Sequence, residues 1–170
     1  MQILMLPDGL APDEFSASPR AYEGTLELAC MPRLAPLLAV AEGEAHVQIE
    51  TGLDEQGRRT LGGWLETAVP LVCQRCLEVY RHLVSGRFRV VIVASEAQGE
   101  ALPEELEPYV SGGTVCPLEV VEEEILLALP TIARHPGGTC QPPEHAAGIS
   151  REALSPFAVL QGRVHRHDPG

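Results

Sequence analysis

The chain has 170 residues, of which 45% are apolar, and a formal net charge of -12. This length suits one ordinary domain, and the apolar fraction is that of a globular protein rather than a disordered one. All 12 basic residues are arginine. So large an acidic excess disfavours a generally nucleic-acid-binding surface, because phosphate neutralisation requires basic side chains. It favours a basic partner, or serves solubility alone.

The first ten residues, MQILMLPDGL, contain no basic start and only a short apolar run before Pro7. They match neither a signal peptide nor a membrane span, and no later segment reaches the roughly 18 apolar residues of a spanning helix. We therefore expect a cytoplasmic protein without membrane contact. The five cysteines are expected to be reduced thiols or metal ligands rather than a disulfide framework.

Three segments in the middle of the chain alternate apolar and polar residues, which is typical of half-buried strands. They lie near residues 44–51, 60–72 and 79–94. Because their connections are short, we expect them to pair in sequence as an antiparallel meander. Residues 1–20 are expected to be irregular apart from a short strand at 3–6. Residues 22–28 form either an edge strand or the lead into a helix around 33–40.

The strongest helix signal follows an acidic segment, rich in proline and glycine, that we expect to be a loop. Pro117 suits the first helical position, and Glu119 lies three residues after Cys116, the spacing of a capping box. The apolar residues that share one face of the predicted helix 117–129 are Leu118, Val121, Ile125 and Leu129. Pro130 ends the helix.

These patterns predict an α+β fold, with a small antiparallel β-meander and one main amphipathic helix packed on it. Residues 1–140 are expected to form this single domain. Residues 141–170 are expected to be a mostly mobile, irregular tail with a short apolar anchor at 155–160.

Cys73 and Cys76 form a Cys-x2-Cys pair between the second and third predicted strands, where a hairpin would turn. His135 and Cys140, spaced as His-x4-Cys, would complete the four ligands of a structural zinc site. Two other interpretations stay open. The pair could consist of bare hairpin thiols, or it could be a redox pair, although thioredoxin-type pairs open a helix inside a βαβ unit.

Arginines recur on the outward side of the third predicted strand. Arg81, Arg87 and Arg89 share one face of that strand, and Arg75 lies at the turn before it. Together they form either a patch that binds phosphate or acidic groups, or the ordinary solvated face of a half-exposed sheet.

Nine glutamates and no basic residue lie between residues 96 and 124. Glu122, Glu123 and Glu124 are consecutive, and three such residues cannot all be buried as a catalytic carboxylate pair would require. We expect them to form a solvated face that can dock a basic partner. No nucleophile elbow, P-loop or dinucleotide fingerprint is present, so a non-enzymatic protein without a small-molecule substrate is favoured.

Five short motifs occur in order along the chain: VPLVCQRCLE, ALPEELEPY, VVEEEILLALP, HPGGTC and SPFAVL. Together they resemble the YceD family of large ribosomal RNA subunit accumulation proteins, from about residue 19 to residue 160. The resemblance implies a bacterial or plastid cytoplasmic factor, without known enzymatic activity, that is needed for normal accumulation of large-subunit (23S) ribosomal RNA. The two cysteine-containing pairs match the family's Cys-x2-Cys and His-x4-Cys motifs.

The leading hypothesis is a non-catalytic ribosome-biogenesis factor whose surface binds a basic ribosomal protein or a large-subunit assembly factor. Direct contact with ribosomal RNA through the arginines is a variant of it. The alternative is a small metal- or thiol-dependent enzyme centred on Cys73 and Cys76. One structural zinc is the candidate cofactor. The candidate partner-binding residues are Glu122, Glu123, Glu124, Arg75, Arg81, Arg87 and Arg89.

Overall fold

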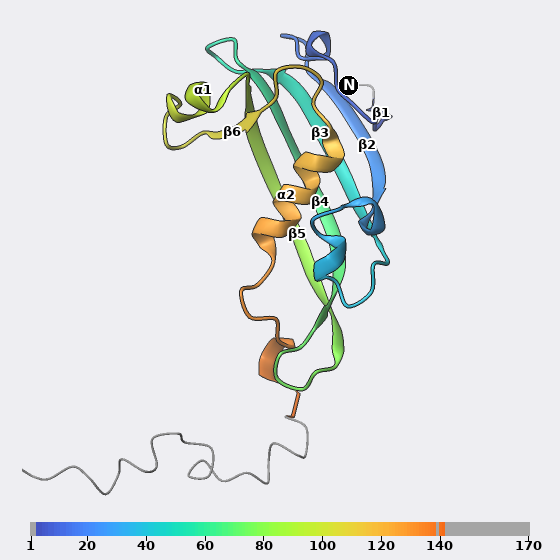
Figure 1. The fold of residues 1–170 in the computed structure, drawn as a ribbon. Coiled ribbons are helices and arrows are strands. Elements are labelled where there is room, and N and C mark those ends of the chain that lie inside the picture. The colour runs from blue at the N-terminus through green and yellow to red at the C-terminus, as the bar shows by residue number, and fades with distance from the viewer. Residues whose placement is uncertain (1–2, 139, 142–170) are drawn as a thin grey trace, which may run out of the picture.

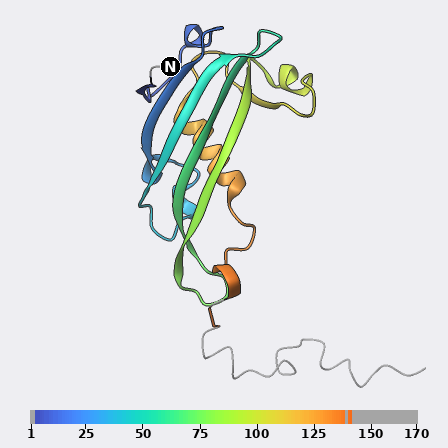
Figure 2. The same cartoon turned by 180° about the vertical axis from the view of Figure 1, so that it is seen from behind.

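The computed structural model describes residues 3–138 and 140–141. Six strands form one sheet in the order β1-β2-β3-β4-β5-β6. Figure 1 shows the 12-residue helix α2 (Pro117–Ala128) lying across one face, here called the inner face, and Figure 2 shows the outer face behind it. The strands are β1 (Ile3–Met5), β2 (Arg20–Glu27), β3 (Glu44–Leu53), β4 (Arg59–Val72), β5 (Val79–Val93) and β6 (Glu107–Val110).

The central part of the sheet follows the alternation in the sequence. Strands β3, β4 and β5 form close to the predicted positions and pair antiparallel in sequence. The predicted fold class, a small antiparallel meander with a helix, is nevertheless wrong. The sheet is mixed and larger, because β1 pairs parallel with β2 and β6 pairs parallel with β5. These two strands have only 3 and 4 residues, too few to show a period of two.

Two segments between the main elements also differ from the predictions. The expected loop before α2 contains the short helix α1 (Glu96–Glu100) as well as β6. The helix expected around 33–40 is replaced by a single 3-10 turn, η3 (Ala35–Leu37), after the similar turn η2 (Leu28–Cys30). The predicted apolar anchor at 155–160 lies outside the described residues.

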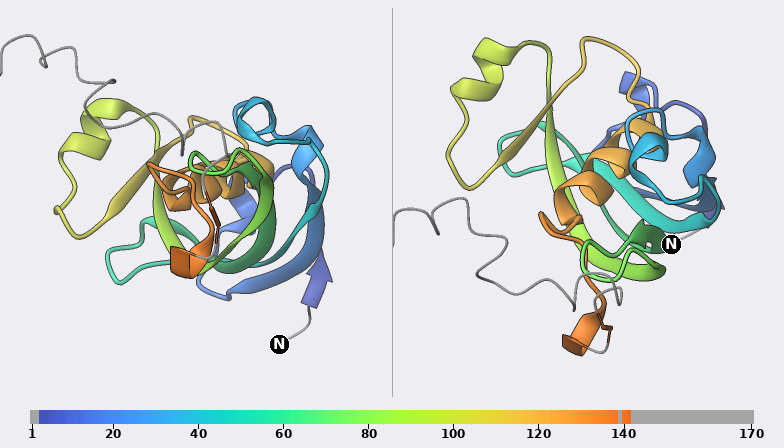
Figure 3. Two further views of the ribbon diagram at one scale, coloured as in Figure 1. Left: turned by 90° about the horizontal axis from the view of Figure 1, so that it is seen from below. Right: turned by 60° about the horizontal axis from the view of Figure 1, so that its bottom comes forward.

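The core fills the space between the inner face and α2. The inward residues are those that the alternation predicts, and the helix adds Val121 and Ile125, both 0% exposed. Viewed from one end, the sheet curves around the helix (Figure 3). Each large aliphatic side chain buried in this way contributes about 1.5–3 kcal/mol. The buried inner-face residues include Ala45, Val47, Ile49, Leu65, Val69, Leu71, Tyr80, Val84, Phe88, Val90 and Ile92.

The start of α2 is stabilised differently from the prediction. Cys116 is the N-cap residue, but its side chain makes no capping hydrogen bond, and Pro117 occupies the first helical position. The carboxylate of Glu119 instead accepts a hydrogen bond from the Tyr109 hydroxyl at 2.9 Å. The contact therefore joins the first turn of α2 to β6. Among the described residues, no helix is long and apolar enough to cross a membrane.

The β4–β5 hairpin is much longer than the helix that covers it. The two strands have 14 and 15 residues, which corresponds to about 45–50 Å, whereas a 12-residue helix spans about 18 Å. Figure 1 shows the hairpin end extending below α2, beside the chain that leaves the helix. The backbone N–H of Gln74 donates to the carbonyl oxygen of Ala133 at 2.8 Å there. This end of the hairpin therefore depends on the segment after α2.

Gly63 provides a test of the packing in the middle of the sheet. An added Cβ would lie 2.4 Å from the Gln48 carbonyl oxygen and 2.9 Å from Ile49 Cγ2. We expect Gly63→Ala to lower the free energy of unfolding by about 1–3 kcal/mol, measured by urea denaturation. Gly86→Ala is the matched control, because an added Cβ meets nothing within 4 Å there. An equal change in both variants would contradict the close approach at Gly63.

Candidate functional site

The turn between β4 and β5 holds Cys73 and Cys76 in a tight loop. The N–H of Cys73 donates to the Glu78 carbonyl oxygen, and the N–H of Leu77 donates to that of Cys73, both at 2.9 Å. The N–H of Arg75 lies 3.4 Å from Cys73 Sγ and donates to it. Leu77 closes the loop with φ of 67°, the left-handed conformation that non-glycine residues adopt rarely.

The segment after α2 brings the second pair of predicted ligands to this turn. The 3-10 turn η4 (Pro136–Gly138) lies between His135 and Cys140, and the His135 ring packs 4.9 Å from the ring of Tyr80 on β5. One ligand atom from each of Cys73, Cys76, His135 and Cys140 lies within 4.8 Å of all the others. The four residues proposed from the sequence are therefore brought together, although 59 or more residues separate the two pairs along the chain.

The distances within the cluster fit a tetrahedral metal ion. Bonds of about 2.3 Å to sulfur and 2.0–2.1 Å to nitrogen place two sulfurs about 3.8 Å apart, and a sulfur and a nitrogen about 3.6 Å apart. Cys73 Sγ lies 3.7 Å from Cys140 Sγ, and Cys76 Sγ lies 3.5 Å from His135 Nδ1. The set of three thiols and one imidazole is one that structural zinc sites use. The cluster can therefore hold a metal ion.

The electrostatics of the cluster favour a thiolate. Burial works to raise the pKa of Cys73, but hydrogen bonds from nearby backbone N–H groups and from His135 outweigh it and lower the pKa to about 5. Burial raises the pKa of Cys140, and its hydrogen bonds and repulsion with Cys73 and Cys76 raise it further. A thiolate with two more thiols against it is an arrangement that a divalent cation would stabilise.

Glu122 does not belong to a solvated acidic face, contrary to the prediction. Its side chain is 1% exposed. One carboxylate oxygen accepts hydrogen bonds from the backbone N–H groups of Arg33 and Leu34, at 2.7 and 3.0 Å, and the other accepts from Arg33 Nε at 3.1 Å. Because these partners precede η3, Glu122 fastens the segment between β2 and β3 onto α2. The carboxylate is buried because it satisfies donors that would otherwise be unpaired.

The other two glutamates of the triplet lie closer to solvent. Glu123 is about half exposed and forms an ion pair with Arg33. Glu124 is partly buried, and this burial, with repulsion from Glu107 and Glu123, raises its pKa. The triplet is thus one buried structural carboxylate and two surface carboxylates. Of the three predicted partner-binding glutamates, only Glu123 and Glu124 are placed where a partner could contact them.

The four candidate arginines do not form one patch. All are exposed, but Arg75 lies on the cysteine turn, at the far end of the hairpin. Arg81 lies six residues, about 20 Å, along β5 from Arg87. Only Arg87 and Arg89 are close neighbours, and both line a hollow on the outer face.

Two further residues were missed by the sequence interpretation. Arg33 is the basic partner of Glu122 and Glu123, and no local pattern connects it with residues almost 90 positions away. Trp64 projects from the outer face and is 38% exposed. Its position could have been read from the alternation, because Leu65 and Thr67 face inward and their neighbours must face outward.

The fold and the cluster define a protein with a mixed six-stranded sheet and a Cys3His candidate metal centre. The family described as Large ribosomal RNA subunit accumulation protein YceD matches residues 61–162. The protein of that name from Haemophilus influenzae is 30% identical over 168 residues, which cover 94% of this chain and 97% of that protein. The chain belongs to the YceD family, as the sequence motifs indicated. No solved structure gives a significant match.

The buried carboxylate on α2 yields a stability prediction. Glu122→Ala leaves two backbone N–H groups and part of the Arg33 guanidinium without their acceptor, so we expect the free energy of unfolding to fall by about 3 kcal/mol. Glu123→Ala removes only a surface ion pair and should cost less than about 1 kcal/mol. Urea denaturation of both variants measures the difference. Equal losses would contradict the structural role of Glu122.

Proposed function

We propose that this protein is a non-catalytic, cytoplasmic factor that supports accumulation of large-subunit ribosomal RNA by docking a basic ribosomal protein or assembly factor. The family and the name of its Haemophilus influenzae relative support the connection with ribosomal RNA. The docking surface is the acidic lobe, defined as residues 96–110, which comprises α1, β6 and their connection. The exposed glutamates of the lobe are Glu96, Glu100, Glu104, Glu105 and Glu107.

The observation that carries the proposal is the absence of neutralising charge on the acidic lobe. Among the described residues, none of its five glutamates forms an ion pair with a basic side chain. The lobe projects beyond the β5 edge of the sheet, where a partner can approach it (Figure 1). Several like charges without counterions create a negative potential that attracts and orients a basic protein.

A groove beside the lobe offers a place for individual basic side chains. It has a volume of about 500 Å³ and lies between β6, the start of α2 and the segment around Arg33. Glu107 and Glu119 line it together with Tyr109, and Arg33, which also lines it, already forms an ion pair with Glu123. The raised pKa of the adjacent Glu124 reflects burial and the repulsion of Glu107 and Glu123. An arginine or lysine of the partner would relieve that repulsion.

The metal centre has a structural role in this proposal. Cys73, Cys76, His135 and Cys140 would hold one zinc ion, which supplies no chemistry beyond joining the hairpin end to the segment after α2. A thiol-dependent enzyme is disfavoured because Cys73, the thiol with the lowered pKa, is 0% exposed and cannot be reached by a substrate.

Metal analysis tests the centre directly. Protein purified without chelators should contain about one zinc per chain, and Cys140→Ser should lose most of it, because one of four ligands is removed. Cys116→Ser is the matched control, since Cys116 lies outside the cluster. Elemental analysis after dialysis gives the stoichiometry. Protein that holds no zinc, or that loses it equally in both variants, would contradict this centre.

The docking proposal is tested with three glutamates of the lobe that form no ion pair among the described residues. The variant Glu100→Gln/Glu104→Gln/Glu105→Gln should capture fewer ribosomal proteins from nuclease-treated lysate and should restore large-subunit ribosomal RNA poorly in a deletion strain. Capture by the unchanged protein should weaken as salt is raised, because exposed charges are screened within about 8–10 Å.

The matched control removes the same charge elsewhere on the surface. Glu42, Glu55 and Glu78 are exposed and lie outside the acidic lobe. Their triple glutamine variant should behave like the unchanged protein. If both triple variants support ribosomal RNA accumulation fully, docking through the acidic lobe is wrong.

A further inference from the structure

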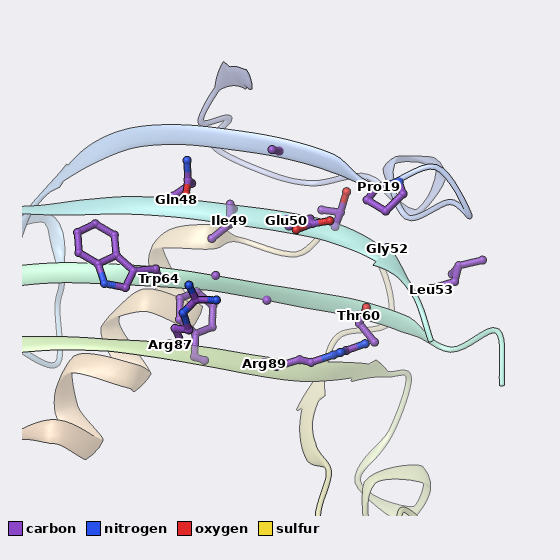
Figure 4. A pocket seen from close by; sticks show the side chains of 15 residues that line it. Pro19, Gln48, Ile49, Glu50, Gly52, Leu53, Thr60, Trp64, Arg87 and Arg89 are labelled. Carbon is purple, nitrogen blue, oxygen red and sulfur yellow. The ribbon is translucent and has the colours of Figure 1, made fainter. Parts of the chain in front are cut away.

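The outer face carries a hollow that the acidic-lobe proposal does not use. Its volume is about 620 Å³. It lies across β3, β4 and β5 (Figure 4), on the side of the sheet opposite α2, and Figure 2 shows the strands from this side. Gly62 forms its floor. Trp64 and Arg87 stand beside the floor at one end, and Arg89 lines one side.

The strand register explains why a hollow forms here. Gln48, Trp64 and Arg87 are direct neighbours across the three strands, and the adjacent row consists of Glu50, Gly62 and Arg89. Since neighbouring strands are about 4.8 Å apart, the Glu50 and Arg89 backbones lie about 10 Å apart with no side chain between them. A flat group of the width of a nucleic-acid base can enter such a gap.

The side chains around the hollow have unused binding capacity. Trp64 is the single tryptophan of the chain, and the residue is 38% exposed. Arg87 and Arg89 form no ion pair with any described carboxylate. Figure 4 shows Arg87 reaching over β4 beside Trp64, and Arg89 running along the strands toward Thr60. An exposed aromatic ring beside two free guanidinium groups is the combination that binds single-stranded nucleic acid.

We propose that this hollow binds a short single-stranded RNA segment, with one base stacked on Trp64 and backbone phosphates at Arg87 and Arg89. We choose RNA over an acidic peptide because a nucleic-acid base can stack on the exposed tryptophan ring, whereas an acidic peptide would use only the two arginines. The choice also rests on the proposed role in ribosomal RNA accumulation. The acidic lobe and the hollow would then contact a basic protein and RNA separately.

The acids on the same face determine how the strand lies. Glu23, Glu50 and Glu66 face outward on β2, β3 and β4, so they repel phosphates from that side. The phosphates therefore run over β5, and the bases point toward β3. There the Gln48 amide and the Glu50 carboxylate can hydrogen-bond to the edges of the bases. The net charge of -12 disfavours RNA over the rest of the surface, so binding depends on local basic side chains such as the two arginines of the hollow.

Trp64 also makes the proposal measurable, because all tryptophan fluorescence comes from the hollow. Hexacytidylate and hexauridylate RNA, titrated at low salt, should quench this fluorescence and raise the anisotropy of a dye on the RNA. Trp64→Ala should weaken binding of the labelled RNA about tenfold or more, whereas Trp64→Phe, which retains a stacking ring, should weaken it less. Melting temperatures of both variants confirm that the fold is retained.

The arginines are tested through the salt dependence of binding. Arg87→Ala/Arg89→Ala should weaken binding and reduce the slope of log K against log salt by about 1.4, since each phosphate contact on a single strand contributes about 0.7. The matched control Arg75→Ala/Arg81→Ala removes the same charge away from the hollow and should leave the slope unchanged.

Three outcomes would overturn the proposal. The first is that neither RNA quenches the fluorescence. The second is an equal loss of RNA affinity in the two arginine variants. The third is quenching by ribosomal proteins but not by RNA, which would make the hollow a protein interface. The outcome is separable from that of the acidic-lobe proposal. The variant Glu100→Gln/Glu104→Gln/Glu105→Gln should bind the RNAs at least as well as the unchanged protein, and loss of RNA binding leaves capture of a basic protein intact.

Discussion

The mismatch in length between the β4–β5 hairpin and α2 governs this structure. A helix of about 18 Å covers only part of strands that run for about 45–50 Å, so segments outside the helix complete the packing along the hairpin. At the uncovered end, three thiols and an imidazole occupy the place of a core. Beside α2, the buried carboxylate of Glu122 holds the segment between β2 and β3 against the helix. These polar contacts thus supplement an apolar core to which Leu28, Met31 and Leu34 of that segment also contribute.

The sequence predicts the long central strands of the sheet, but not the short strand β6 or the buried position of Glu122. Alternation places β3, β4 and β5 because each strand is long and buried on one face only, so its periodicity repeats many times. Strand β6 consists of four residues in an acidic segment with Pro108, and its pairing with β5 depends on the folded chain. Glu122 looks like a surface residue because its acceptor role involves backbone N–H groups some 90 residues away.

The same distinction applies to the sites. Cysteine and histidine spacing carries the four candidate ligands, because few other roles require that pattern in a chain expected to keep its thiols reduced. The arginines show a pattern too, but a spacing of two, or a multiple of two, along a strand shows only that residues face the same side. It does not show that they are close together. Arg75 and Arg87 therefore lie far apart although they looked like one group. The possible binding role of Trp64 follows only from the strand register, which places it beside Gln48 and Arg87.

The hairpin also has an open edge. Strand β6 pairs with only Val90–Val93 of β5, so, among the described residues, most of β5 has no strand on the side away from β4. Free strand edges invite pairing with other molecules, which ends in aggregation. The bulky charged side chains of Arg81, Arg87 and Arg89 follow this edge and oppose the close stacking of identical copies. The long unpaired edge of β5 therefore carries side chains that oppose self-association.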